Sequence, residues 1–187
     1  EIFVEGFTSP PTLVLIGGGH VNWAVSRWAS FLGFRMYAVD DRVEFANKER
    51  FPEAETRVIS DYSRGLENVA VNSNTYIVVA TRGHRYDDLA LAAAIRTPAR
   101  YIGLLGSKRK TLEIYKNLLK EKVPPERLRE VYAPIGLNIG AITPEELAVS
   151  IMAEIIMVRN GGTGMSMKMN TANLNTLMKH EDLDQAL

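Results

Sequence analysis

Residues 12–22 read TLVLIGGGHVN, and this stretch decides the fold class. The apolar run from Leu13 to Ile16 has the length of a strand and is followed directly by three glycines, which is typical of a strand buried on both faces of a parallel sheet. The next segment, 20–32, carries apolar side chains at helical spacing, and Gly33 supplies a stop. A buried strand, a glycine turn and a helix in this order predict the start of a dinucleotide-binding type of α/β fold.

The alternation of strand and helix continues along the chain. The last helix has a clear start, because Thr143 can cap it, Pro144 suits its first position and Glu146 completes a capping box. The alternating order predicts a doubly wound parallel sheet, Rossmann-like, with helices on both faces in three layers. We expect further strands at 35–39, 56–59, 75–80 and 101–105, a short last strand at 129–132, and helices at 86–95, 107–120 and 143–159.

The chain has 187 residues, enough for one full core, so we expect a single α/β domain over 11–162. Residues 1–10 are expected to form a lead-in that ends at a Pro-Pro pair. Residues 163–187 are expected to form a polar tail that contains Met and Asn. Because the first residue is Glu1 rather than Met, we expect a fragment of a longer protein or a processed chain.

The composition argues against several classes of protein. Lys and Arg number 22, and so do Asp and Glu, which makes general attachment to nucleic acid or to an anionic membrane unfavourable. There is no cysteine for a disulfide or a thiolate metal site, and the three histidines are scattered, so we expect no metal site. With no signal sequence and no apolar run of membrane length, we expect a cytoplasmic protein.

The glycine triplet is the first candidate site. Gly17 permits the tight turn, and Gly19 lets backbone amides approach a pyrophosphate that sits on the positive end of the following helix. We therefore expect Gly17, Gly18, Gly19 and His20 to bind a phosphate group. Asn22 occupies the position where the dinucleotide pattern has its third glycine, which is a departure from that pattern.

An acidic residue at the end of the second strand, about 20 residues further on, normally binds the ribose hydroxyls of a dinucleotide. Asp40 has this position and is followed by Asp41 and Arg42, all three of which are candidate cofactor-binding residues. Asp40 favours a free 2′-hydroxyl, whereas Arg42 could accept a 2′-phosphate. The sequence therefore leaves the choice between NAD and NADP open.

The loops after the later strands should meet the glycine turn at the same edge of the sheet. After the strand at 75–80, Thr81 and Arg82 are candidate ligand-binding residues. His84 is a candidate for proton transfer, with local hydrogen bonding as the alternative. The segment 134–140 has spaced glycines and can pass close to a ligand, and segment 44–52 can either line the site or pin its own loop through Asn47 and Arg50.

The loop after the strand at 101–105 begins a helix with backbone amides, a hydroxyl and cations, which suits an anion. Its candidate cofactor-binding residues are Gly106, Ser107, Lys108 and Arg109. The alternative is that these cations only form a solvated helix face.

Taken together, several stretches resemble the XdhC/CoxI family, the accessory proteins of xanthine dehydrogenase and related molybdenum hydroxylases. The resemblance covers about 11–162, the Rossmann half of such proteins, and leaves out the separate amino-terminal domain of the family. The stretches are GGGHV at 17–21, VDDR at 39–42, FAN at 45–47, RFP at 50–52, YIGLLGSKRK at 101–110, APIGLNIGA at 133–141 and TPEE at 143–146.

The resemblance implies a role in maturing a molybdoenzyme. Family members are understood to hold the molybdenum cofactor (molybdopterin), to support its sulfuration and to pass it to the apoenzyme. The implied partners are a xanthine dehydrogenase-type apoenzyme and a cysteine desulfurase, although this chain has no cysteine that could engage sulfur directly.

Two other functions stay open on the sequence. One is an NAD(P)-dependent oxidoreductase with His84 as proton donor, and the other is a nucleotide-sensing module without chemistry that acts through dimer contacts. The helix at 143–159 is apolar on most sides, apart from a stripe made of Glu146, Ser150 and Glu154, so we expect it to be covered on more than one face. This pattern predicts a homodimer.

Overall fold

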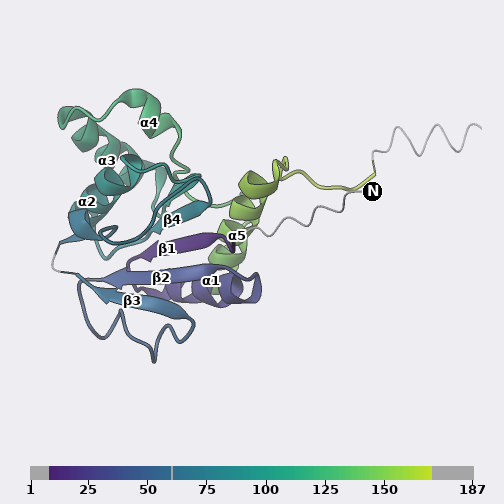
Figure 1. Ribbon diagram of the computed structural model, residues 1–187. Coiled ribbons are helices and arrows are strands. Elements are labelled where there is room, and N and C mark those ends of the chain that lie inside the picture. The colour runs from purple at the N-terminus through teal and green to yellow at the C-terminus, as the bar shows by residue number, and fades with distance from the viewer. Residues whose placement is uncertain (1–8, 60, 170–187) are drawn as a thin grey trace, which may run out of the picture.

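Five parallel strands form the centre of the molecule, in the order β3-β2-β1-β4-β5. The computed structural model describes residues 9–59 and 61–169 of the chain. The carboxyl ends of the strands lie towards the left in Figure 1. The strands are β1 (Thr12–Ile16), β2 (Arg35–Asp40), β3 (Ala54–Val58), β4 (Thr75–Val79) and β5 (Tyr101–Leu104).

Helices cover both faces of this sheet, which confirms the predicted doubly wound, three-layer α/β fold. Helices α1 (His20–Phe31) and α5 (Pro144–Asn160) pack on one face, while α2 (His84–Ile95) and α3 (Lys108–Lys120) pack on the other (Figure 1). A 3₁₀ turn, η1 (Tyr62–Arg64), and the short helix α4 (Pro125–Arg129) complete the described elements.

Each central strand contributes to two cores, because successive side chains of a strand point to opposite faces. In β1, Leu13 and Leu15 belong to the core under α1 and α5, whereas Val14 and Ile16 belong to the core under α2 and α3. All four are fully buried. The continuous apolar run seen in the sequence is therefore explained by a strand covered on both sides.

The predicted last strand at 129–132 is wrong for all but one residue. Pro125 stands in the first turn of α4, a position that suits proline because its missing N–H would have no helical partner, and the helix runs to Arg129. Only Tyr132 continues the sheet, through an isolated parallel bridge to Gly103. Pro134, two residues further on, has no N–H to extend the pairing.

The topology places the end of β1 beside the end of β4. From β1 the chain moves outwards to β2 and β3, and then crosses back to β4 and β5 on the other side. This reversal is the position where open parallel sheets bind ligands, outside the carboxyl ends of the strands. No helix in the described part of the chain combines the length and the apolar character that crossing a membrane would require.

Candidate functional site

The glycine turn after β1 has a closed half and an open half. A Cβ atom at Gly17 would lie 2.2 Å from the carbonyl oxygen of Ala80, and its φ of +101° is a conformation that favours glycine. A Cβ atom at Gly18 would lie 2.0 Å from the carbonyl oxygen of Phe45. At Gly19, in contrast, no described atom other than those of Gly19 and its neighbours in the chain lies within 4 Å of the Cβ position, and the following His20 is exposed. Backbone covers Gly17 and Gly18, while Gly19 and His20 are free to approach a ligand.

Asn22 takes the place of the third glycine by turning its side chain under the turn. The side chain is fully buried, and its Nδ2 donates hydrogen bonds to the carbonyl oxygens of Ile16 (3.2 Å) and Gly17 (2.7 Å). The residue that departs from the dinucleotide pattern thus holds the turn from below and leaves Gly19 uncovered.

The carboxylate of Asp40, at the end of β2, braces the same turn. Its Oδ2 accepts a hydrogen bond from the backbone N–H of Gly18 (2.7 Å), and its Oδ1 accepts from the N–H of Arg42 (3.0 Å). Arg42 also donates through Nε to Oδ1 (2.9 Å) and through Nη2 to Oδ2 (3.2 Å). Burial raises the pKa of Asp40, but the Arg42 guanidinium and the two backbone N–H groups outweigh it, so the pKa is lowered and the carboxylate stays ionised.

The segment 42–50, here called the strap, crosses over Gly18. The guanidinium carbon of Arg42 lies 3.6 Å from the ring centroid of Phe45, and that of Arg50 lies 5.2 Å from the same centroid. Arg50 reaches the turn itself, because its Nε donates to the carbonyl oxygen of Gly18 (2.8 Å). Its Nη2 is buried and has no hydrogen-bond partner among the described residues. The strap therefore brings two cations to the glycine turn.

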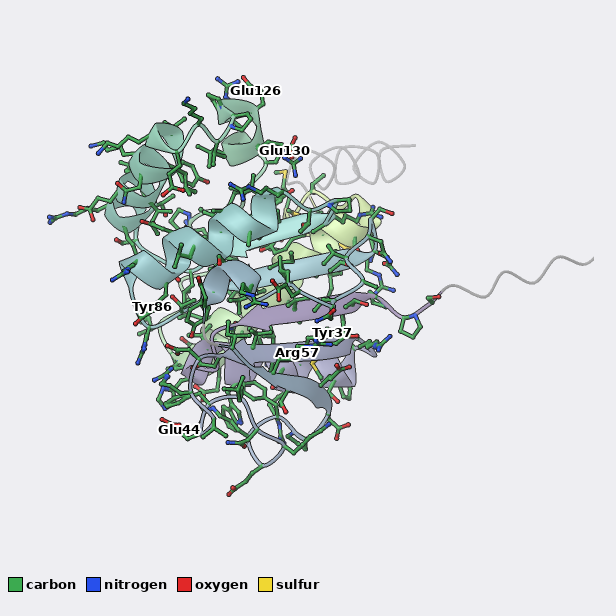
Figure 2. The ribbon with its side chains drawn as sticks, turned by 60° about the vertical axis from the view of Figure 1, so that its left-hand side comes forward. Tyr37, Glu44, Arg57, Tyr86, Glu126 and Glu130 are labelled. Atoms are coloured by element: carbon green, nitrogen blue, oxygen red, sulfur yellow. The ribbon has the colours of Figure 1, made fainter. Side chains whose placement is uncertain are left out.

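Asp41 joins the end of β2 to the loop after β4. Its carboxylate accepts from Arg82 Nη2 (2.6 Å) and from the hydroxyl of Tyr62 (3.0 Å), and Arg82 also donates to the hydroxyl of Tyr86 (3.0 Å). Burial, helped by the charge of Asp40, raises the pKa of Tyr62, so this hydroxyl remains a donor. Figure 2 shows Tyr86, on α2, at the same end of the molecule as Glu44 of the strap.

Thr81 is held by a buried acid rather than directed at solvent. Its N–H and its hydroxyl both donate to Asp87 Oδ1, at 3.0 and 2.7 Å, and Asp87 is fully buried. The other oxygen of Asp87 forms an ion pair with Lys110 of α3. This pair ties the loop after β4 to the loop after β5. Asp87 was not proposed from the sequence, and Lys110 was considered there only as one of the cations at the start of the helix.

The loop after β5 contributes less to this edge than the sequence suggested. Ser107 caps α3 by accepting from the N–H of Lys110 (3.2 Å), and the side chain of Lys110 packs near Gly106. Lys108 is exposed, and the side chain of Arg109 is 91% exposed and pairs with Glu113. Among the described contacts none joins Lys108 or Arg109 to the glycine turn, so their part in binding stays a prediction.

Three further candidates lie as follows. His84 is the first residue of α2, and its side chain lies outside what the structure describes, so its proposed proton transfer stays a prediction. Gly136, in the glycine-spaced segment 134–140, donates its N–H to Glu154 of α5 (3.0 Å). In residues 9–59 and 61–169 no group of three or more histidine and acidic side chains is arranged to hold a metal ion.

The arrangement is suited to holding an anion. Gly19 is the N-cap residue of helix α1 and provides no side-chain cap, so the partial positive charge of the first helical turn is available on the open side of the glycine turn. Arg42 and Arg50 add cations from the strap, and Arg82 adds one from the loop after β4. Arg50 and Phe45 are the contributors that sequence reasoning missed or left open, although the stretches FAN and RFP marked their segment.

A parallel sheet of this order, with a glycine turn where its connections reverse, defines a Rossmann-type domain. Residues 13–155 match the model of the XdhC Rossmann domain family, and the chain belongs to that family.

Two curated relatives and one solved structure are similar to most of this chain. It is 35% identical over 165 residues to the uncharacterized protein YqeB of Escherichia coli K12, covering 88% of this chain and 30% of YqeB. It is 34% identical over 159 residues to a probable xanthine dehydrogenase subunit of Bacillus subtilis 168, covering 85% and 46%. A crystal structure of a xanthine dehydrogenase from Bacillus halodurans matches with a TM-score of 0.68 and 29% identity, covering 85% and 45%. The chain thus spans less than half the length of each.

Proposed function

We propose that this chain is the ligand-holding Rossmann unit of an accessory protein for a xanthine dehydrogenase-type molybdoenzyme. Its membership of the XdhC Rossmann domain family supports this role, and so do two relatives that are named as xanthine dehydrogenase or as part of it. Because the chain spans less than half of those proteins, the activity and partners of the whole protein are part of the proposal. A cysteine desulfurase and the apoenzyme are the partners proposed.

The observation that carries the ligand proposal is the open half of the glycine turn. A helix N-terminus offers backbone N–H groups and a partial positive charge to a phosphate, provided that the phosphate can come close. The space over Gly19 permits this approach, and the guanidinium of Arg50 lies beside it at the carbonyl of Gly18. We propose that a phosphate group binds there.

The molybdenum cofactor and a nucleotide both carry such a phosphate, and the glycine turn can accommodate the phosphate of either ligand. In the first case Gly19 and His20 hold the phosphate through their backbone, and the metal centre of the cofactor supplies the redox chemistry of the target enzyme. This chain has no cysteine, so in this proposal sulfur for the cofactor is supplied from outside it. The function of this chain is then to hold and orient, without a reaction of its own.

A binding titration with one substitution tests this proposal. Gly19 has a φ of −66°, which any residue adopts, so Gly19→Val should fold normally while its side chain enters the space that a phosphate needs. We expect isothermal titration with molybdopterin, and separately with pyrophosphate, to show affinity weakened at least about tenfold.

Gly162→Val is the matched control. It lies beyond the end of α5, where an added Cβ makes only ordinary contacts with Met157. Equal affinity of wild type, Gly19→Val and Gly162→Val for both probes would show that the glycine turn is not the binding site.

A further inference from the structure

We infer that the strap, residues 42–50, is a specificity element that fills the adenosine-ribose side of the glycine turn, so that the site takes a phosphate-bearing ligand but rejects adenosine dinucleotides such as NAD. The inference rests on the phosphate binding proposed above and names which ligands that site excludes. Three observations carry it, one on Asp40, one on Gly18 and one on the strap itself.

In a dinucleotide-binding domain, the carboxylate at the position of Asp40 accepts hydrogen bonds from the ribose hydroxyls. Here it has no acceptor site left. An ionised carboxylate offers about four lone-pair sites. Asp40 receives four donors, one from the N–H of Gly18 and three from Arg42, and it is 0% exposed. Ribose hydroxyls would have to displace Arg42 to reach it.

The backbone of the strap also covers the neighbouring part of the turn. The carbonyl oxygen of Phe45 stands so close to Gly18 that a single added carbon there would lie 2.0 Å from it. The N–H of Gly18 is bound to Asp40 and its carbonyl to Arg50, so both polar groups of this residue are engaged. A ligand therefore meets protein over Gly18 and open space over Gly19.

The strap is held in this position from both of its ends. Arg42 and Arg50 both lie against the ring of Phe45, and Arg50 donates its backbone N–H to Asn47 Oδ1 (2.9 Å). Asn47 in turn donates through Nδ2 to the carbonyl of Val43 (3.0 Å). Phe51, directly after the strap, is 1% exposed and anchors it in the core under α1. Moving the strap would break these contacts together and leave Asp40 without its cation, so a ligand that avoids this displacement is favoured.

Two probes separate the adenosine side from the phosphate side. Pyrophosphate is the charged group alone, whereas in ADP-ribose this group is esterified to adenosine on one side and to a second ribose on the other. For the wild-type chain we expect isothermal titration to give binding of pyrophosphate, and affinity for ADP-ribose at least about tenfold weaker. In Arg42→Ala, which removes the two side-chain donors to Asp40 and keeps the backbone N–H of position 42, we expect affinity for ADP-ribose to rise at least about tenfold, with a much smaller change for pyrophosphate.

A double variant, Arg42→Ala with Phe45→Gly, also removes the ring against which Arg42 and Arg50 lie in the wild type. We expect it to raise the affinity for ADP-ribose further. Arg96→Ala, at an exposed arginine at the end of α2, is the charge-matched control and should leave both affinities unchanged. Tighter binding of ADP-ribose than of pyrophosphate by the wild-type chain overturns the inference and leaves phosphate binding standing, whatever the variants do. Binding of neither probe by the wild-type chain overturns the proposed function instead.

Discussion

Glu154, on α5, is a charged residue that the fold keeps inside. It is 7% exposed, and its Oε2 accepts from the hydroxyl of Tyr101 (2.5 Å) and from the N–H of Gly136 (3.0 Å). Burial, and then the negative charge of Glu154, raises the pKa of Tyr101 well above its ordinary value, so this hydroxyl stays a donor. One carboxylate thus joins α5, β5 and the segment that follows Pro134.

Glu154→Ala should therefore be strongly destabilising. It leaves the buried hydroxyl of Tyr101 and the partly buried N–H of Gly136 without an acceptor, and an unsatisfied buried group costs about 1–3 kcal/mol. We expect urea unfolding to show a loss of about 3 kcal/mol in the free energy of unfolding, against less than about 0.5 kcal/mol for the exposed Glu145→Ala on the same helix. Equal losses in the two variants would mean that Tyr101 and Gly136 find other partners.

The residue scale also shows how far the site could be predicted from the sequence. The position of Asp40 followed from its spacing to the glycine triplet, because β1 and β2 are neighbours and their ends meet. The return of Arg42 onto Asp40 had no sequence signal, since an arginine at this position can equally point at a ligand. The contact of Arg50 with Gly18 joins residues 32 positions apart and depends on how the strap folds.

At the scale of elements, the start of α5 shows what local sequence determines. The hydroxyl of Thr143 accepts from the N–H of Glu146 (3.2 Å), while Glu146 Oε2 accepts from the N–H groups of Thr143 (3.0 Å) and Ile142 (2.7 Å). The predicted capping box is confirmed. These two backbone N–H groups lower the pKa of Glu146, so its stabilisation is present above about pH 4.5 and is lost as the pH falls through the lowered value.

Removing the cap measures its contribution. We expect Thr143→Ala to lower the free energy of unfolding at pH 7 by about 1 kcal/mol, because the N–H of Glu146 loses its acceptor. Thr143→Ser keeps the hydroxyl and should restore most of the loss. Urea unfolding of the three proteins decides the matter, and a serine variant as unstable as the alanine variant would argue against the hydroxyl as the cause.

The regular elements could be predicted because their side chains repeat with the period of a helix or of a buried strand. The polar stripe on α5 could not be placed in this way. Glu146 is exposed, whereas Ser150 and Glu154 face inwards, and Ser150, which is 3% exposed, donates to the carbonyl of Leu137 (2.6 Å). The stretch REVY at 129–132 looked like a strand, but its pairing depends on what lies beside β5, which no local pattern encodes.

At the scale of the whole molecule, charge is balanced overall and paired locally. The formal net charge is zero, so the proposed anionic ligand would be attracted by the groups at the carboxyl ends of the strands rather than by a long-range field. There the pairs Asp41–Arg82 and Asp87–Lys110 link loops from different strands. The homodimer, the cytoplasmic location and the division into lead-in, domain and tail stay predictions, and the tail residues 170–187 lie outside the described residues.

The buried ion pair of Asp40 and Arg42 should make the stability of the molecule depend on acid. The pKa of Asp40 is lowered from 3.8, so the stabilisation it provides is complete above about pH 3.8 and is lost as the pH falls through the lowered value. We expect Asp40→Asn to lower the free energy of unfolding by about 3 kcal/mol at pH 7, because Arg42 loses its buried partner charge. Urea unfolding at a series of pH values below 4 should show the two proteins converging, while exposed Glu53→Gln tracks the wild type throughout. A difference that stays constant down to pH 2 would mean that the ionised carboxylate is not what braces the turn.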